Sequence, residues 1–377
     1  MTRIVYMDIK KRKVDVIFNT TLVCPWDCEI CCVDAVHVGK VGNDIFIKHN
    51  NLEVIETFPD DMSDMSIYEQ AAMRRVERGE ELSLEDKKKI IDNLSGYDAK
   101  IDISGGDALV LKDNFDLLGY ASEKLGKNNV TLTATGLGTS KVDIKQVAEL
   151  ISEYNFTFDA ASLKDIANRP NGYSMGNLKR AGRFVELGCK TRAELPLTTD
   201  IISREHLERL YLKLNEYNID KLLIMRLFPV GRGTTKIDKI PSREEYLLAI
   251  DILKEMENKY HTPVVKLQCA LRNIVPSDVD KNPCDMLSES FGITPDGKLL
   301  ASPWAYSCGG KVLHDCWELG DIVQNRLEVL LSGDKAQRYY RRLEENKGHC
   351  KLFSFINSNK INPEDRLFDS ADKLHCN

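Results

Sequence analysis

The 377-residue chain lacks the features that mark membrane, secreted and nucleic-acid-binding proteins. No apolar run is long enough to cross a bilayer. The first residues carry Asp8 and a basic run at 10–13 where a signal peptide has an apolar core. A long basic block is missing too, and the formal net charge is −6, which argues against a nucleic-acid scaffold. We therefore expect a cytoplasmic protein that engages neither a membrane nor a nucleic acid.

Without a secretory signal, the eleven cysteines have little reason to form disulfides. In such a chain, cysteines are more readily explained as metal ligands than as a disulfide framework. The remaining composition, 42% hydrophobic and 29% charged, is that of an ordinary soluble protein. The length exceeds that of a single core, so we expect a large domain with a smaller one.

Three of the cysteines form a CxxxCxxC run at Cys24, Cys28 and Cys31. Thiolate is a soft ligand suited to iron–sulfur clusters, and three thiolates can hold three irons of one 4Fe–4S cube. The fourth iron is then open to a ligand that is not protein. Spacing alone leaves a zinc knuckle or a chance cluster as an alternative. Cys32 adjoins the third cysteine and cannot easily share the cube, so we interpret it as a neighbour.

From about residue 84 to 230 the chain alternates helical and strand patterns. Ser83 is placed to cap a helix through Leu94. Strands are expected at 14–19, 100–104, 130–135, 156–160, 192–196 and 221–225, with further helices near 114–125, 144–154 and 177–187. This alternation predicts right-handed βαβ units and a parallel sheet, whose ligands bind at the carboxyl ends of the strands. The cysteine run and the Gly105-Gly106-Asp107 turn both follow predicted strands.

The order of these elements resembles that of the radical S-adenosylmethionine (SAM) enzymes. The resemblance implies the α/β fold of a partial (β/α)6 barrel. It also implies a SAM-binding 4Fe–4S cluster on Cys24, Cys28 and Cys31, whose open iron chelates the amino and carboxylate groups of SAM. Reductive cleavage of SAM then gives a 5′-deoxyadenosyl radical that abstracts hydrogen from a C–H bond. An external electron donor such as flavodoxin or ferredoxin is implied as a partner.

The same resemblance extends to residues that contact SAM. Gly105 and Gly106 would let backbone carbonyls approach the methionine amino group, and Asp107 would add a charge partner. Many relatives have Glu at that position, so we expect the contact of Asp107 to be shorter or indirect. Ile30, just before the third cysteine, would supply an apolar contact on the adenine side.

Two later residues are carried over in the same way. Ser162 and Arg169 resemble a serine and an arginine that touch the SAM ribose and carboxylate in relatives. From the residues alone, an exposed loop serine and a surface arginine are equally good interpretations. The segment Phe228-Pro-Val-Gly-Arg-Gly233 looks like the end of the sixth strand in peptide-modifying relatives.

We divide the chain into a barrel, 1–240, and a C-terminal domain, 241–377. Within the barrel, 33–82 is an unusually long insertion with a hairpin near 45–58 and a helix at 67–78. Long insertions at the ligand face of a barrel commonly shape substrate access, so the insertion is either a substrate lid or a solvated excursion.

The C-terminal domain begins with a helix capped by Ser242 and includes a hairpin on a Pro-Asp-Gly297 turn. It resembles the α+β SPASM/twitch domains, which bind auxiliary iron–sulfur clusters. However, Ser302 stands where the next cysteine is expected, and the CxxCx5C run is missing. The resemblance therefore implies one auxiliary 4Fe–4S cluster. Its expected ligands are Cys284, Cys308, Cys316 and Cys350.

The alternative for this ligand set is that several of these cysteines are ordinary buried thiols. Cys189, Cys269 and Cys376 are left unassigned, and Cys269 is the first substitute ligand. A cluster beside the substrate implies a net oxidation, such as a cross-link or a dehydrogenation. Lys, Tyr and Cys side chains are all possible proton acceptors, and spacing does not select one, so no catalytic side chain is assigned.

SPASM/twitch relatives mostly modify ribosomally made peptides, which makes a peptide the first expected substrate class. Only about twenty residues precede Cys24, too few for the leader-binding domain that many peptide modifiers carry there. A small molecule, such as a sugar, a nucleotide or a natural-product intermediate, is therefore the alternative. A non-catalytic iron–sulfur scaffold is a third interpretation, which the intact cysteine and glycine motifs disfavour.

Overall fold

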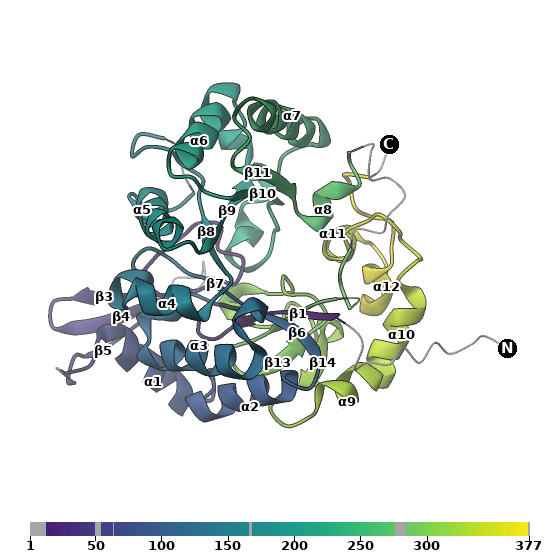
Figure 1. The fold of residues 1–377 in the computed structure, drawn as a ribbon. Helices are drawn as coiled ribbons and strands as arrows, with labels where there is room; N and C mark the ends of the chain where they lie inside the picture. Colours follow the sequence, from purple (N-terminus) through teal and green to yellow (C-terminus); the bar gives the residue numbers. More distant parts are fainter. Residues whose placement is uncertain are drawn as a thin grey trace.

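The computed structural model describes residues 13–49, 54–62, 64–165, 168–275, 284–287 and 289–375. Within these residues one ten-stranded sheet has the order β11-β10-β9-β8-β7-β6-β1-β12-β13-β14 (Figure 1). The strands that run parallel are β1 (Lys13–Asn19), β6 (Asp98–Ser104), β7 (Val130–Thr133), β8 (Glu153–Thr157), β9 (Lys190–Leu197), β10 (Lys221–Arg226) and β11 (Val264–Leu267). The predicted alternation of strands and helices is therefore confirmed.

Helices connect the parallel strands and cover the outer side of the sheet (Figure 1). They are α2 (Leu84–Leu94), α3 (Lys112–Leu125), α4 (Ile144–Leu150), α5 (Tyr173–Glu186), α6 (Arg204–Glu216) and α7 (Arg243–Tyr260). The caps predicted from the sequence are present: Ser83 accepts a hydrogen bond from the Asp86 amide, and Ser242 forms a capping box with Glu245. Each helix turns a buried apolar face toward the strands, as Ile90, Ile91 and Leu94 of α2 do.

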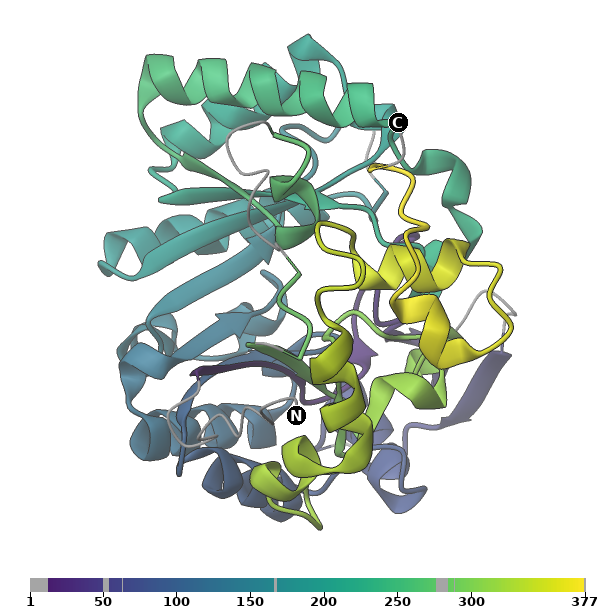
Figure 2. The same cartoon turned by 90° about the vertical axis from the view of Figure 1, so that its right-hand side faces the viewer.

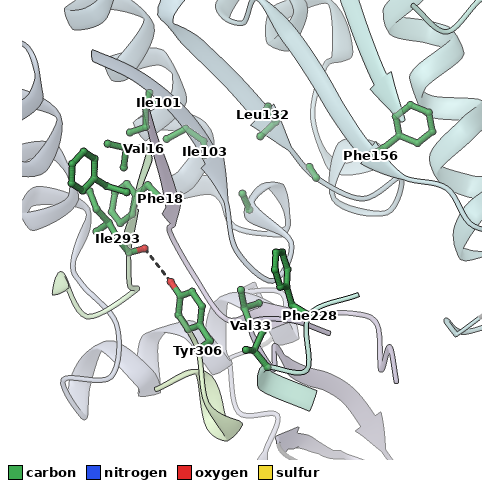
Figure 3. Packing of buried hydrophobic residues seen from close by; sticks show 14 of the residues in the cluster. Val16, Phe18, Val33, Ile101, Ile103, Leu132, Phe156, Phe228, Ile293 and Tyr306 are labelled. Atoms are coloured by element: carbon green, nitrogen blue, oxygen red, sulfur yellow. Dashed lines mark hydrogen bonds between the residues drawn. The ribbon is translucent and has the colours of Figure 1, made fainter. Parts of the chain in front are cut away.

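The sheet continues beyond β1 into the C-terminal part of the chain. β12 (Ser290–Ile293) pairs in parallel with β1, and β13 (Lys298–Leu300) and β14 (Glu318–Asp321) follow antiparallel. Phe18, Ile103 and Ile293 pack where β1, β6 and β12 meet, and the Tyr306 hydroxyl donates to the Ile293 carbonyl (Figure 3). The predicted hairpin on the Pro-Asp-Gly297 turn is therefore part of the main core.

The C-terminal helices lie on the side of the molecule away from α4 and α5, at the right in Figure 1 and toward the viewer in Figure 2. They are α9 (Leu327–Ser332), α10 (Asp334–Arg342), α11 (Lys351–Asn357) and α12 (Pro363–Leu367). A short helix, α8 (Cys269–Arg272), follows β11 directly. Strand β11 extends the barrel sheet past residue 240, and the division at 240/241 stays a prediction.

The insertion at 33–82 is a packed unit. Its strands β3 (Val36–Val41), β4 (Asp44–His49) and β5 (Val54–Pro59) form a sheet of order β2-β3-β4-β5 with β2 (Val23–Cys24), which precedes the insertion. The helix α1 (Ile67–Glu77) follows these strands. Ile45 and Ile47 are buried, which excludes the solvated excursion for this part. The predicted hairpin and helix are confirmed. Residues 50–53, between the two strands of the hairpin, lie outside the described residues. Strand β3 was missed, although the Gly42-Asn43 turn signals a hairpin before β4.

The position of one strand was predicted wrongly from the sequence. We expected a strand at 156–160, whereas β8 spans Glu153–Thr157 and α4 ends at Leu150. The reason is the polar interior of the barrel: Glu153 forms ion pairs with Arg192 and Lys221 of neighbouring strands. A glutamate therefore belongs to the strand.

In the described part of the chain, no helix combines the length and apolar character needed to cross a membrane.

Candidate active site

The CxxxCxxC run lies at the carboxyl end of β1, at the edge of the sheet where ligands bind in parallel folds. Cys24, Cys28 and Cys31 all line one cavity of about 400 Å³. Cys24 and Cys28 are buried, and Cys31 is partly exposed with its sulfur accepting a hydrogen bond from the Ala35 amide at 3.2 Å. The three predicted ligands are thus brought together.

Burial raises the pKa of the Cys24 thiol well above its usual range, and the neighbouring Asp107 and Cys28 add to the shift. Burial likewise raises the pKa of Cys28 to about 11. Crowded thiols of this kind hold their protons until a cation displaces them. The ten cysteines in the described residues are free thiols.

The cysteine loop fits the donor set of an iron–sulfur cube. Thiolates are the soft ligands that such a cluster takes, and the three cysteines line one cavity. Within the described ranges, no three His, Cys, Asp or Glu side chains are arranged to hold a single metal ion.

The Gly105-Gly106 turn lines the same cavity, as predicted, but the reason for the glycines differs. A Cβ at Gly105 would lie 2.2 Å from the Thr21 carbonyl oxygen, and a Cβ at Gly106 would lie 2.4 Å from that of Val23. The Gly106 amide donates to the Thr21 carbonyl at 2.8 Å. The glycines therefore let the turn pack on the backbone that leads into Cys24.

Asp107 does not line the cavity, which corrects its expected role as a charge partner of SAM. Its buried carboxylate accepts hydrogen bonds from the Thr135 hydroxyl and from the Gly138 amide at 2.8 Å. Burial raises the pKa of Asp107 to about 6 against these donors. The residue ties the turn after β6 to the loop after β7. Gly138 is required there, because a Cβ would lie 2.2 Å from the Asp107 carboxylate.

Arg169 and Ile30 lie at the cavity and Ser162 does not. The Arg169 Nε donates to Asp159 at 3.0 Å, and its guanidinium lies 5.0 Å from the Tyr173 ring centroid. Ser162 is exposed in a separate shallow pocket, where its hydroxyl accepts from the Lys164 amide. The structure therefore brings Arg169 to the cysteine loop and leaves Ser162 outside the cavity.

Sequence reasoning missed Trp26, which stands inside the cysteine run and lines the cavity. Its indole Nε1 donates to the Thr135 hydroxyl at 3.1 Å, and its ring meets Tyr173 edge-on at 5.3 Å. It also missed the polar floor formed by Asp102, Arg192 and Glu194, where burial raises the pKa of Asp102 to about 6. These three side chains form a floor only because they point from their strands into the cavity, which the sequence alone does not show.

A second group of cysteines differs from the predicted auxiliary set. Cys269, Cys284 and Cys350 line one small pocket with Ser302 and Lys351. Burial raises the pKa of Cys269 and of Cys350, the latter to about 12. The neighbouring Cys284 is the next cause of both shifts, so the three thiols lie close together.

Cys308 and Cys316 do not line this pocket, so the structure does not bring the predicted four cysteines together. The Cys308 sulfur lies 3.5 Å from the Gly231 carbonyl oxygen, and Cys316 has Lys335 and Glu364 as its charged neighbours. Cys269 takes their place because it begins α8 directly after β11. The sequence pattern did not show that β11 belongs to the barrel sheet, so the position of Cys269 at its carboxyl edge was hidden.

The cysteine pocket and the main cavity share a wall. Cys269, Asp285, Phe228 and Trp304 line both. The Phe228 ring stacks on Trp304 with centroids 5.3 Å apart. The second cysteine group thus borders on the main cavity through Cys269.

The Gly106 geometry yields a test. Gly106→Ala would place a methyl group against the backbone of Leu22 and Val23, and overpacking of this kind costs about 1–3 kcal/mol of unfolding free energy. We expect a lower melting temperature and less iron after anaerobic reconstitution, since the cysteine loop is displaced. Gly119→Ala is the matched control, because nothing lies within 4 Å of its Cβ position. Full iron content with weakened SAM binding would place the Gly106 methyl against the ligand.

Comparisons with known proteins agree with this geometry. No family model matches the chain. The Fe-coproporphyrin III synthase of Methanosarcina barkeri (strain Fusaro / DSM 804) is 24% identical over 198 residues, which cover 51% of this chain and 48% of that protein. The match therefore spans about half the length of this curated relative.

Two solved structures are similar over nearly the whole chain. Streptococcus suis SuiB bound to the precursor peptide SuiA has a TM-score of 0.63 at 16% identity, covering 94% of this chain and 74% of SuiB. Histidine-tagged anSMEcpe with bound AdoMet has a TM-score of 0.60 at 14% identity, covering 97% of each chain. The chain therefore has the fold of these two proteins, and the fold class that the resemblance implied, a partial α/β barrel continued by a C-terminal part, is confirmed.

Proposed function

We propose that the chain is a radical SAM enzyme that oxidatively modifies its substrate. The observation that carries the proposal is the pair of cysteine groups bordering on one cavity, Cys24/Cys28/Cys31 and Cys269/Cys284/Cys350. The first group would hold the SAM-binding 4Fe–4S cluster. When bound, this cluster and SAM supply the radical that removes hydrogen from a C–H bond.

The residues of the chain would bind and shield these groups. Ile30 and Trp26 offer apolar surface at the cavity wall, and Arg169, whose side chain is 10% exposed, offers a positive charge for a carboxylate. Stacked Phe228 and Trp304 close the cavity toward the C-terminal pocket. A largely apolar enclosure keeps out water and stray hydrogen donors, which is what the protein contributes when the cofactor supplies the chemistry.

The second cysteine group would hold one auxiliary 4Fe–4S cluster, a ready electron acceptor that makes an oxidation the expected outcome. Three thiolates from Cys269, Cys284 and Cys350 leave one iron without a cysteine ligand in the described part of the chain, and Ser302 lines the pocket at the position of the missing one. Lys351 is 1% exposed, and within the described residues its amine has no hydrogen-bonding partner. A buried ammonium next to this pocket suits the negative charge of a thiolate-bound cluster.

A peptide is the substrate class we propose. Support comes from two structural neighbours of the same fold, SuiB bound to the precursor peptide SuiA and anSMEcpe bound to the Cp18Cys peptide. A small molecule is the second candidate, supported by the likeness to Fe-coproporphyrin III synthase. The proposal includes a cytoplasmic location, where thiols stay reduced, and an external electron donor such as flavodoxin or ferredoxin.

Removal of the first cysteine group tests the central part of the proposal. The reconstituted chain is expected to carry about eight iron and eight sulfide, from two cubes. Cys24, Cys28 and Cys31 changed together to Ala should remove about half the iron and all SAM cleavage, measured as 5′-deoxyadenosine. Cys189→Ala, a buried thiol outside the cavity lining, is the control. Persisting SAM cleavage in the triple variant would defeat the assignment.

Removal of the second group tests the auxiliary site. The Cys269→Ala/Cys284→Ala/Cys350→Ala variant should fall to about four iron and still cleave SAM, while losing the oxidised product. The matched control is Cys308→Ala/Cys316→Ala, which should keep about eight iron because these thiols lie elsewhere. Iron loss in the control, with none in the triple variant, would restore the ligand set expected from the sequence.

A further inference from the structure

The segment between β10 and the next turn, Arg226-Leu-Phe-Pro-Val-Gly-Arg232, connects the two cysteine groups. Both of its charged ends are buried: Arg226 is 3% and Arg232 is 5% exposed. Two buried arginines so close in the chain are unusual, because each guanidinium must be paired to leave water. Their partners show what each arginine holds.

Arg232 holds the first cysteine loop. Its Nη1 donates to the Asp27 carboxylate at 2.5 Å and to the Cys28 carbonyl at 3.0 Å. Its Nε donates to Asp34 at 2.8 Å, and its Nη2 donates to the Ala35 carbonyl. One guanidinium therefore fixes the chain within the cysteine run, at Asp27 and Cys28, and just after it, at Asp34 and Ala35.

The backbone of the segment reinforces this contact. The Arg232 amide donates to the Cys31 carbonyl at 2.9 Å. Gly231 has φ of +53°, and a Cβ there would lie 2.5 Å from the Cys32 carbonyl oxygen. A glycine is needed at this position both for its backbone conformation and for the close approach. The segment and the cysteine loop are thus packed backbone against backbone.

Arg226 holds the second group through a carboxylate. It forms a two-point ion pair with Asp372, with distances of 2.7 and 2.8 Å and side-chain exposures of 2% and 0%. The same Asp372 carboxylate accepts a hydrogen bond from the Cys350 amide at 3.0 Å. Arg226 also lies 3.3 Å from the ring centroid of Phe353, in the helix that Cys350 caps.

Between the two arginines, Phe228 occupies the wall shared by the cavity and the pocket. Its ring lies 5.3 Å from Trp304 and 5.6 Å from Phe353, both from the C-terminal part. The short span of backbone leaves little freedom between the two ends, since Pro229 fixes its own φ.

We propose that this segment sets the position of the two cysteine groups relative to each other. Arg232 positions the Cys24–Cys31 loop, and Arg226 positions Cys350 through Asp372. Both are positioning residues. The identity of the clusters bound by the two cysteine groups rests on the proposed function. The division of labour, in which Arg232 positions the first group and Arg226 the second, rests on the contacts above.

A crossed experiment separates the two roles. Arg226→Lys and Arg232→Lys keep the charge but lose the planar fork that makes two-point contacts. Each is introduced into the two cysteine triple variants, which retain only the second or only the first group. With only the first group present, Arg232→Lys should lose at least half of the iron and alter the cluster's EPR signal and its response to SAM, and Arg226→Lys should not. With only the second group present, Arg226→Lys should lose at least half of the iron and alter the cluster's EPR signal, and Arg232→Lys should not.

Two further variants guard against simple unfolding. Asp34→Asn and Asp372→Asn preserve shape and should reproduce the effects of Arg232→Lys and Arg226→Lys, respectively. Arg338→Lys, which alters a half-exposed pair with Glu364, should leave iron and EPR unchanged in both backgrounds. Equal loss in both backgrounds, or no loss in either, would overturn the division of labour. A parent chain that binds no iron would instead overturn the proposed function.

Discussion

The parallel pairing of β1 with β6 is the interaction on which the site depends. Lys13–Asn19 pairs with Asp98–Ser104 along the full length of both strands, so their loops leave the same edge of the sheet. The cysteine loop and the glycine turn are thereby pressed together, with amides of the turn donating to Thr21 and Val23. On its other side β1 pairs with β12. One strand therefore places both the first cysteine group and the C-terminal hairpin.

Buried charged side chains select one arrangement of the loops at this edge of the sheet. Desolvating an arginine and a carboxylate costs about as much as their attraction returns, so pairs such as Arg226–Asp372 add little net stability. Their two-point geometry instead selects one arrangement of the loops, since a shifted loop would leave a buried charge unpaired. Asp107 acts in the same way with neutral donors, because it locks two successive strand loops together.

Local signals predicted much of this fold and less of the site. The cap at Ser83, the strand–loop positions of Cys24–Cys31 and Gly105-Gly106, and the Pro-Asp-Gly297 turn are all encoded by nearby residues. The auxiliary ligands were partly wrong because they depend on long-range topology: Cys269 joins Cys350 only after β11 completes the sheet. The direction of the Asp107 side chain and the close contact of Gly106 with the backbone of Leu22 and Val23 depend on tertiary packing, which spacing along the chain does not reveal.

The most direct measurement of the central claim is an anaerobic crystal structure with SAM, recorded at the iron absorption edge. We expect two separate groups of anomalous iron peaks bordering on one cavity, one at Cys24, Cys28 and Cys31 and the other at Cys269, Cys284 and Cys350. SAM should lie at the first group, beside Gly105 and Arg169. A single iron site, or a second one at Cys308 and Cys316, would contradict it.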